Sequence, residues 1–337
     1  MKKKMLAFML VIMTALCSCG KEKSGQPQIS TAEFLTEVCN SKNYGKDLYS
    51  NTPLAKIGEN EFLVFARGVF VPYNESSVIA VAAKEIDTPK ETAVGGYVGD
   101  CSYEHTRICM YNFNSSEITE LAKVDSEVFY INLHNDNILE YHIGNAVMLL
   151  DISTGKQYTA HEYNEYDKPF DINLTVYNDG EFYFILYSED WNEFYLCSYD
   201  LETDTEQILN TSDDSADSLG FPVIYNDTVC FAKHGEDSVL LFDAHTHGQL
   251  AEISSDNELY RIYGQGLFEY FGNAAFNNLE ENKVFSIEKG EVQEYTLPEN
   301  NYSHARFYYT DDGVYMMTTA FDESSEDIDK KWFFIDM

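Results

Sequence analysis

One phrase returns along this chain at nearly even intervals, and it constrains the fold strongly. Each copy holds an apolar or aromatic run, usually an Asp or Asn, a polar turn and a second alternating run, as in MLLDISTGKQYTA at 148–160. This pattern predicts a β-hairpin. The spacings are 39, 49, 43, 43 and 50 residues, and the anchor residues are Asn112, Asp151, Asp200, Asp243, Ser286 and Asp336. A period of about 45 residues is typical of a four-stranded propeller blade.

The intervals between anchors contain two more strand-like runs each. In one unit these are 170–177 and 181–188, separated by the turn-forming triplet Asn178-Asp179-Gly180. The chain is therefore predicted to be all-β, a six-bladed β-propeller of four-stranded antiparallel blades over 52–337. The last copy stops after its third strand, so we expect the N-terminal run 52–57 to complete that blade and remove its open edge. The run from Thr88 to His105 predicts an inserted loop, or a seventh blade if it contains an extra sheet.

This repeat resembles that of six-bladed propellers of the TolB-like or WD40-like kind, which occur in many bacterial lipoproteins. The resemblance covers 52–337 as an architecture and rests on the repeat alone. It implies a fold, and no functional residues are carried over from it.

The N-terminus has the pattern of a secretory signal. A basic start, Met1 to Lys4, precedes an apolar run from Met5 to Leu16 that is too short to span a bilayer stably. The sequence Leu16-Cys17-Ser18-Cys19-Gly20 then resembles the lipobox of bacterial lipoproteins, which implies lipidation of Cys19 and an extracytoplasmic protein anchored to a bacterial membrane. Which membrane holds the anchor stays open.

Four segments follow from these patterns. They are a signal peptide at 1–18, a flexible tether at 19–29, a short helix with a linker at 30–51 and the propeller at 52–337. Ser30 and Glu33 have the spacing of a capping box, which predicts the start of the helix.

Charge and cysteine usage narrow the class of partner. The formal net charge of −35 argues against nucleic acid, whose phosphates require positive charge on the protein. Cys109, Cys197 and Cys230 lie in apolar strand-like runs and are expected to be buried as small hydrophobes. A disulfide between Cys39 and Cys101 stays open.

The fragment Ser153-Thr154-Gly155-Lys156 shares letters with two catalytic motifs. A phosphate-binding loop requires a glycine where Leu150 stands and a helix after the lysine, and a Ser-x-x-Lys acylase also requires a helix. A strand–turn–strand pattern surrounds the fragment, so we interpret it as a hairpin turn. In a propeller the repeated turns gather on one face, and the longer acidic connections gather on the opposite face.

The longer connections supply the candidate site. Exposed aromatic rings could stack on a sugar or peptide, and nearby carboxylates could bind its hydroxyls or a positive charge. These residues are Tyr163, Tyr166, Asp167, Asp190 and Trp191. Calcium is a weaker possibility, with Asp213, Asp214 and Asp217 as oxygen donors but without a defined loop motif. His245 and His247 are interpreted as turn residues without a third metal ligand.

Two functions of different classes follow. The first is a membrane-anchored binding or scaffold lipoprotein that recognises a protein, peptide or glycan at the acidic loop-rich face. The alternative is a propeller enzyme, such as a glycan hydrolase or lyase, that uses carboxylates at that face. No cofactor is indicated besides calcium.

Overall fold

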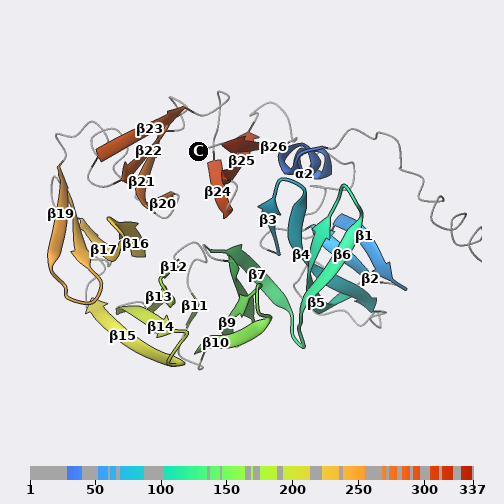
Figure 1. The fold of residues 1–337 in the computed structure, drawn as a ribbon, viewed down its shortest axis with the longest axis horizontal. Helices are drawn as coiled ribbons and strands as arrows, with labels where there is room; N and C mark the ends of the chain where they lie inside the picture. Colours follow the sequence, from blue (N-terminus) through green and yellow to red (C-terminus); the bar gives the residue numbers. More distant parts are fainter. Residues whose placement is uncertain are drawn as a thin grey trace, which may run out of the picture.

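The computed structural model shows six antiparallel β-sheets arranged in a ring (Figure 1). It describes residues 29–39, 52–59, 61–65, 69–86, 102–134, 137–144, 146–163, 168–169, 175–187, 193–212, 222–234, 238–254, 268–270, 273–278, 283–288, 291–296, 304–310, 313–321 and 328–335. We number the sheets as blades 1 to 6 in chain order.

Blades 1 to 3 contain strands β1 to β15. Blade 1 comprises β1 (Thr52–Gly58), β2 (Glu61–Phe65), β3 (Phe70–Asn74), β4 (Ser77–Ile86), β5 (Ser102–Asn112) and β6 (Glu117–Lys123). Blade 2 comprises β7 (Val128–Leu133), β8 (Ile138–Ile143), β9 (Ala146–Asp151) and β10 (Lys156–Glu162). Blade 3 comprises β11 (Lys168–Pro169), β12 (Val176–Asn178), β13 (Glu181–Tyr187), β14 (Phe194–Asp200) and β15 (Thr205–Ser212).

Blades 4 to 6 contain strands β16 to β26. Blade 4 comprises β16 (Pro222–Tyr225), β17 (Thr228–His234), β18 (Ser238–Asp243) and β19 (Gln249–Ser254). Blade 5 comprises β20 (Phe268–Tyr270), β21 (Asn273–Asn278), β22 (Lys283–Glu288) and β23 (Glu291–Thr296). Blade 6 comprises β24 (His304–Thr310), β25 (Gly313–Phe321) and β26 (Ile328–Ile335).

The first and last blades meet at the inner side of the ring. Strand β3 of blade 1 contacts both β7 of blade 2 and β24 of blade 6, and β16 contacts β12 and β21 of the two blades beside it. Figure 1 shows β3, β7, β12, β16 and β24 on the side of their sheets that faces the middle of the ring. The fold is therefore an all-β, six-bladed propeller, as predicted. The described residues form six sheets, so the alternative of seven blades finds no support among them.

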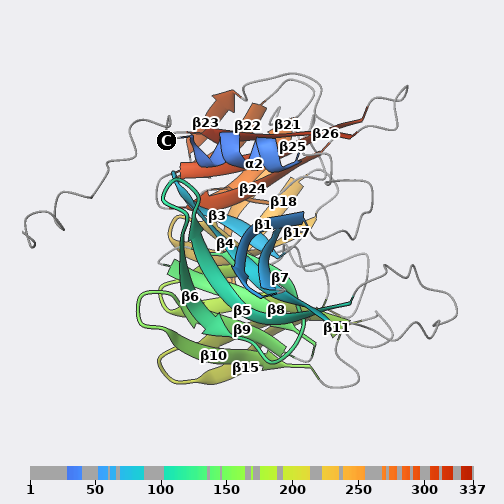
Figure 2. The same cartoon turned by 90° about the vertical axis from the view of Figure 1, so that its right-hand side faces the viewer.

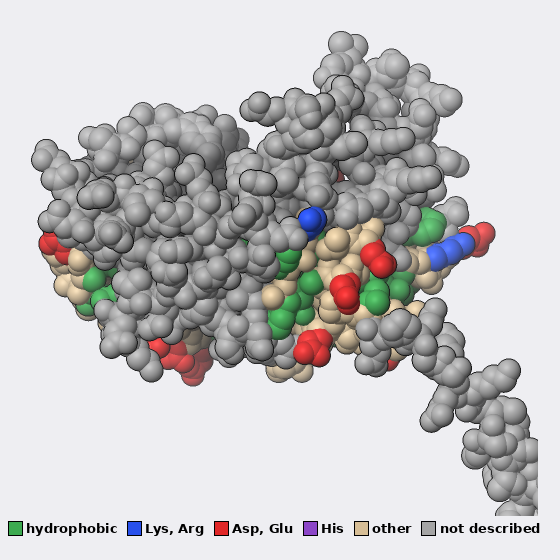
Figure 3. All heavy atoms as spheres, turned by 90° about the horizontal axis from the view of Figure 1, so that it is seen from above, with side chains coloured by type: hydrophobic (Ala, Val, Ile, Leu, Met, Phe, Trp, Pro, Cys, Tyr) green, Lys and Arg blue, Asp and Glu red, His purple; other side chains and the backbone are tan. Residues whose placement is uncertain are grey.

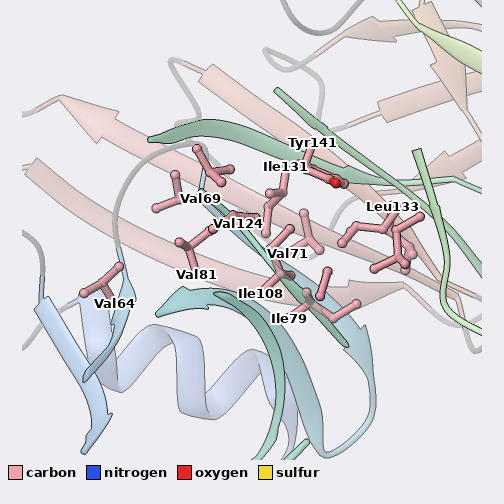
Figure 4. Close-up of a cluster of buried hydrophobic side chains, with 14 of the residues drawn as sticks. Val64, Val69, Val71, Ile79, Val81, Ile108, Val124, Ile131, Leu133 and Tyr141 are labelled. Atoms are coloured by element: carbon pink, nitrogen blue, oxygen red, sulfur yellow. The ribbon is translucent and has the colours of Figure 1, made fainter. Parts of the chain in front are cut away.

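Apolar side chains fill the space between neighbouring blades. Ile79 and Ile108 of blade 1 pack against Ile131, Leu133 and Tyr141 of blade 2 in one cluster of buried residues (Figure 4). Strand β4 shows the alternation that this packing requires: Ile79, Val81 and Ala83 lie in this cluster, because every second side chain of a strand points to the same face. Cys109, Cys197 and Cys230 are buried free thiols, as expected. Burial raises the pKa of Cys109 and of Cys230 to about 12.

The repeated anchor residues close the outer hairpins in one common way. The Asp151 carboxylate accepts hydrogen bonds from the backbone N–H groups of Ser153 (2.9 Å) and Thr154 (3.2 Å). Asp243 accepts the equivalent pair from His245 (2.9 Å) and Thr246 (2.6 Å). The fragment Ser153–Lys156 is thus a hairpin turn, as the sequence indicated.

The fourth residue after each of these anchors turns the chain. Gly155 has φ 72° and His247 has φ 57°, and the equivalent residues after Asn112 and Asp200 are Ser116 (φ 61°) and Asp204 (φ 56°). Their left-handed conformation lets the second strand return beside the first. Asp336 lies outside the described residues, and Ser286 differs from the other anchors because it lies within β22, paired with Gln293.

The prediction that residues 52–57 complete the last blade is wrong. Strand β1 pairs with β2, and both belong to blade 1, where Glu61 of β2 pairs with Lys84 of β4. Arg107 of β5 stabilises the position of the β1–β2 hairpin, because its Nε and one terminal nitrogen bind the Glu61 carboxylate at 3.0 and 2.6 Å. That ion pair fixes the hairpin on blade 1, away from the edge of blade 6.

Helix α2 (Thr31–Cys39) covers the edge of blade 6 instead. It lies against β26 (Figures 1 and 2), and the backbone N–H of Trp332 donates to the Thr36 hydroxyl at 3.1 Å. Leu35 is fully buried in one cluster with Tyr315 and Trp332. Covering an edge strand with a helix is one of the ways in which proteins reduce the aggregation hazard of an open sheet edge.

The predicted capping box starts this helix. The Ser30 backbone N–H donates to the Glu33 carboxylate at 2.8 Å, and the Glu33 N–H donates back to the Ser30 hydroxyl at 3.3 Å. The hydrogen bonds from Ser30 lower the pKa of Glu33. Among the described residues no helix is long and apolar enough to cross a membrane.

Candidate functional site

The ring has two unlike faces, which we name by their connections. The turn face carries the hairpin turns that follow Asn112, Asp151, Asp200 and Asp243, together with turns such as Asp179–Gly180 that join the first two strands of a blade. The loop face is opposite and includes the starts of the inner strands and the end of β10. Figure 2 views the ring from its side, with the strands running between these faces. Figure 3 shows acidic side chains spread over the described part of the rim.

Only one of the predicted ligand-binding residues lies in the described part of the chain. Tyr163 follows β10 on the loop face and is half-buried, and its ring lies edge-on to His161 with centroids 5.3 Å apart. Tyr166, Asp167, Asp190 and Trp191 lie outside the described residues, as do Cys19 and the calcium candidates Asp213, Asp214 and Asp217. Residues 164–167 and 188–192 are bordered by Lys168, Tyr187 and Phe194, whose backbones are paired in blade 3.

A buried carboxylate lies inward of Tyr163. Glu140 on β8 is fully buried, and its Oε1 lies 2.5 Å from Nε2 of His142, while its Oε2 lies 2.8 Å from Nε2 of His134. The Thr175 hydroxyl donates to the same Oε2 at 2.7 Å. An ionised carboxylate only accepts hydrogen bonds, so this geometry assigns the Nε2 hydrogen to both imidazole rings.

These contacts decide the charge state of Glu140. Burial alone would raise the pKa of this carboxyl, but the hydrogen bonds from His134 and His142 outweigh burial and hold the pKa below its usual range. Glu140 is therefore an anion at neutral pH, with three donors around it. Burial of such a charge is tolerated only when hydrogen bonds replace its hydration.

The cluster joins two blades. Glu140 and His142 share the face of β8 that faces blade 3, because they are two residues apart on one strand. Thr175 immediately precedes β12 of blade 3, and Phe182 of β13 lies edge-on to the His134 ring with centroids 5.6 Å apart. The hydroxyl of Tyr163 lies 3.4 Å from Nδ1 of His142. A chain of polar contacts thus runs from the loop face to the buried carboxylate.

A β-bulge exposes an aromatic ring beside the polar contacts that link Tyr163 to Glu140. The pairing of β7 with β8 shifts between Val128 and Tyr130, which leaves Phe129 as the extra residue. Phe129 is 39% exposed, and its ring lies 5.6 Å from that of His142 in an edge arrangement. Nδ1 of His105 accepts a hydrogen bond from the Val128 N–H at 2.9 Å, which holds the start of the bulge against blade 1. Bulges often redirect a side chain next to a functional site.

The buried surroundings of His105 favour its neutral form. Burial lowers the pKa of His105, and the nearby Glu127 opposes this effect only in part. A neutral imidazole keeps Nδ1 as the acceptor that the Val128 N–H requires. The position of Phe129 therefore depends on a histidine that stays uncharged at neutral pH.

His245 and His247 connect blade 4 with blade 3. Nε2 of His245 lies 3.0 Å from the Tyr183 hydroxyl and 3.2 Å from a Glu181 oxygen, and Nε2 of His247 lies 2.8 Å from the Leu209 carbonyl oxygen. Both histidines thus link the turn of blade 4 to blade 3. No group of three or more His, Cys, Asp or Glu residues suited to a metal ion occurs in the described part of the chain.

Comparison with known proteins finds only distant structural similarity. No family model matches the chain, and no curated protein matches it. The β-propeller domain of the trilobed protease from Pyrococcus furiosus has a TM-score of 0.47 and 11% identity, over 84% of this chain and 85% of that one. An oligogalacturonate lyase in complex with manganese has a TM-score of 0.44 and 14% identity, over 73% and 69%. TolB from Acinetobacter baumannii has a TM-score of 0.37 and 14% identity, over 68% and 62%.

The chain is a β-propeller by its own sheet topology. At these identities and TM-scores the similarity says nothing of function, which depends on the residues of this propeller.

The sequence interpretation missed the Glu140 cluster. A signal was present, since β8 reads ILEYHI and places Glu140 and His142 two residues apart in an otherwise apolar strand. Two polar residues on one face of a buried strand indicate a buried polar contact, because strand positions i and i+2 share a face. His134 and Thr175 gave no such signal, since their proximity depends on how blades 2 and 3 pack in the propeller.

Proposed function

We propose that this protein is an extracytoplasmic lipoprotein that binds a partner protein, peptide or glycan at the loop face of its propeller. The N-terminal pattern supports the location, with an apolar signal run followed by the lipobox cysteine Cys19. The acidic balance of the chain favours neutral or cationic ligands.

The observation that carries this proposal is the bulge at Phe129. A single exposed aromatic residue is unremarkable, but this one lies on an inner strand beside His142, whose ring is held by the buried Glu140. Rigid aromatic side chains provide contact area at low entropic cost. Tyr163 borders the same histidine, and we propose that Tyr166, Asp167, Asp190 and Trp191 extend the ligand-binding surface from the adjacent connections.

Binding to glycan and peptide arrays tests this proposal. Replacement of Phe129 by Ala should weaken binding of any ligand found for the wild-type protein by about tenfold, since an aromatic anchor contributes about 1–2 kcal/mol. Leu250→Ala is the matched control, because Leu250 is also exposed (44%) but lies on β19 beside the turn face. Equal binding by wild type and Phe129→Ala would contradict the proposed site.

The lipid anchor has its own test. Wild-type protein expressed in bacteria should incorporate radiolabelled palmitate, and Cys19→Ala should not. Equal labelling of the two proteins, or no labelling of either, would refute lipidation of Cys19.

An enzymatic role is the second candidate, favoured by the contacts from Tyr163 through His142 to Glu140. The hydroxyl of a half-buried tyrosine, next to an imidazole and a buried carboxylate, could transfer a proton to or from a substrate, as a glycan hydrolase or lyase requires. Incubation with a panel of oligosaccharides, with detection of new reducing ends and unsaturated products, tests this candidate. Turnover that is lost in Tyr163→Phe would support an enzymatic role. Turnover unaffected by Tyr163→Phe and His142→Gln would show that the contacts from Tyr163 to Glu140 are not responsible for the activity.

A further inference from the structure

The residues that precede α2 are fixed to the turn face of blade 1. The Ile29 backbone N–H donates to Oδ1 of Asn114 at 3.3 Å, and Nδ2 of Asn114 donates to the Ile29 carbonyl oxygen at 3.2 Å. Asn114 lies in the hairpin turn between β5 and β6. Ile29 is thus held on this face by a pair of reciprocal hydrogen bonds.

Contacts with a second turn of blade 1 reinforce this attachment. The Thr31 hydroxyl donates to the Asn74 carbonyl oxygen at 2.6 Å, and the Thr31 N–H donates to the Glu75 carbonyl oxygen at 3.1 Å. Asn74 and Glu75 belong to the turn between β3 and β4, which also lies on the turn face. Phe34 then stacks on Phe113 with ring centroids 4.3 Å apart. Two turns and one aromatic stack therefore fix the start of α2.

The helix itself leads away from that face. Thr36, one turn further along α2, contacts Trp332 in the middle of β26, so the helix rises along the edge strand from the turn face. Any chain that precedes Ile29 consequently approaches the propeller on the side of the hairpin turns. The loop face, with Phe129 and the end of β10, lies at the other ends of the strands.

Chain length limits how far an anchor at Cys19 could lie from this point. Nine residues lie between Cys19 and Ile29, so the segment has ten Cα–Cα steps. Such a segment can span at most about 35 Å when fully extended, and a flexible chain of that length has an average reach of about 17 Å. Contact of the loop face with the bilayer would require the segment to pass along the whole side of the ring.

We propose that the propeller is oriented with its turn face towards the membrane, so that its loop face opens away from the bilayer. This inference rests on the proposed lipid anchor at Cys19 and adds to it the side of the molecule that partners can reach. A ligand of the loop face would therefore come from the aqueous side, and bilayer lipids would not be its target.

Energy transfer from the two ends of strand β10 tests the orientation. Lys156 and Glu162 are exposed residues at the turn-face end and the loop-face end of this strand, about 20 Å apart at the rise of a β-strand. Separate Lys156→Cys and Glu162→Cys variants of the lipidated protein would be labelled with a donor dye. They would then be incorporated into phosphatidylcholine vesicles that carry a headgroup-linked acceptor, with protein lacking the added cysteine as the labelling background.

The proposal predicts about twofold higher transfer efficiency from position 156 than from position 162, given their separation along the strand. Equal efficiencies, or a higher value at position 162, would overturn the orientation. Flotation of the vesicles before the measurement tests the lipid anchor at Cys19 separately. Wild-type protein that fails to float, like the Cys19→Ala variant, would refute the lipid anchor and with it the orientation.

Discussion

Two contacts between blades use opposite chemistry. Blades 2 and 3 are joined around the fully buried anion Glu140, which accepts hydrogen bonds from His134, His142 and Thr175. Blades 6 and 1 are joined on the outside by α2, whose Leu35 and Phe34 pack among apolar and aromatic side chains. The first contact is directional and intolerant of a missing partner, while the second depends on buried apolar area.

This difference shows how a ring of similar sheets can treat its blades differently. Apolar packing tolerates small shifts, so it suits the place where the two ends of the ring must find each other. A hydrogen-bonded carboxylate tolerates no unpaired donor, so it fixes the position of blade 3 relative to blade 2 and with it the surroundings of Tyr163. The directional contact thus lies beside the candidate site, where the arrangement of side chains matters most.

Removal of the buried anion should have the largest effect. Glu140→Ala leaves two buried imidazole N–H groups and the Thr175 hydroxyl without their acceptor, and should lower the free energy of unfolding by about 3–5 kcal/mol. Urea titration followed by tryptophan fluorescence or circular dichroism measures this loss. The exposed Glu162→Ala on the same blade should change it by less than about 0.5 kcal/mol. A loss below about 1 kcal/mol for Glu140→Ala would show that the directional contact is not critical.

Truncation of a side chain in the apolar contact that α2 makes between blades 6 and 1, which we call the closure, should have the second-largest effect. Leu35→Ala removes a fully buried side chain from α2, and should lower the free energy of unfolding by about 2–4 kcal/mol through lost burial and a cavity. The same urea titration applies, with the exposed Glu37→Ala on this helix as the control. A loss for Leu35→Ala larger than that for Glu140→Ala would reverse the comparison and make the closure the dominant contact.

Acid should weaken the contact between blades 2 and 3 more than the closure. The folded-state pKa of Glu140 lies below its unfolded value of about 4.3, so its contribution is complete above that pH and is lost as the pH falls through the folded pKa. Each unit of this difference corresponds to about 1.4 kcal/mol. Unfolding free energies measured between pH 7 and pH 3 should therefore fall less in Glu140→Gln than in the wild type. Leu35→Ala should keep the wild-type slope, and equal slopes in all three proteins would contradict this assignment.

The hairpin turns should contribute least. Asp151→Ala deprives the Ser153 and Thr154 N–H groups of their acceptor and should lower the free energy of unfolding by about 1 kcal/mol, as loss of a cap does at a helix start. Asp151→Asn should cost less, because Asn112 fills the same position in blade 1 and its amide oxygen accepts from the Ser115 N–H. Thermal unfolding of the two variants side by side measures the difference. An Asn variant as unstable as the Ala variant would show that charge, rather than the acceptor, matters at this position.

Most of the fold could be predicted from the sequence because the repeat consists of short-range patterns. Strand alternation, the Asp anchors and the triplet Asn178-Asp179-Gly180 all act within a few residues, so they could be recognised without knowledge of the rest of the chain. The closure could not be predicted in the same way. Strand β1 and helix α2 are both N-terminal segments that could cover the edge of blade 6, and the choice between them depends on the Arg107–Glu61 ion pair and on the packing of Leu35.

The candidate site was predicted less completely for the same reason. Tyr163 was identified from its place in a long connection, and the structure places it beside His142. Phe129 was missed because a bulge cannot be recognised from alternation alone, and its exposure depends on a one-residue shift in pairing. The sites proposed at Tyr166, Asp167, Asp190 and Trp191 remain predictions.

The contact between α2 and β26 also has a consequence for the order of assembly. The hydrogen bond from Trp332 to Thr36 joins residues 296 positions apart, whereas each outer hairpin closes over only a few residues. Contacts between distant residues form late, because the entropy of closing a long loop must be overcome first. During synthesis the helix emerges before any blade exists and must wait for the last strand. The ring is therefore expected to remain open until β26 has left the ribosome.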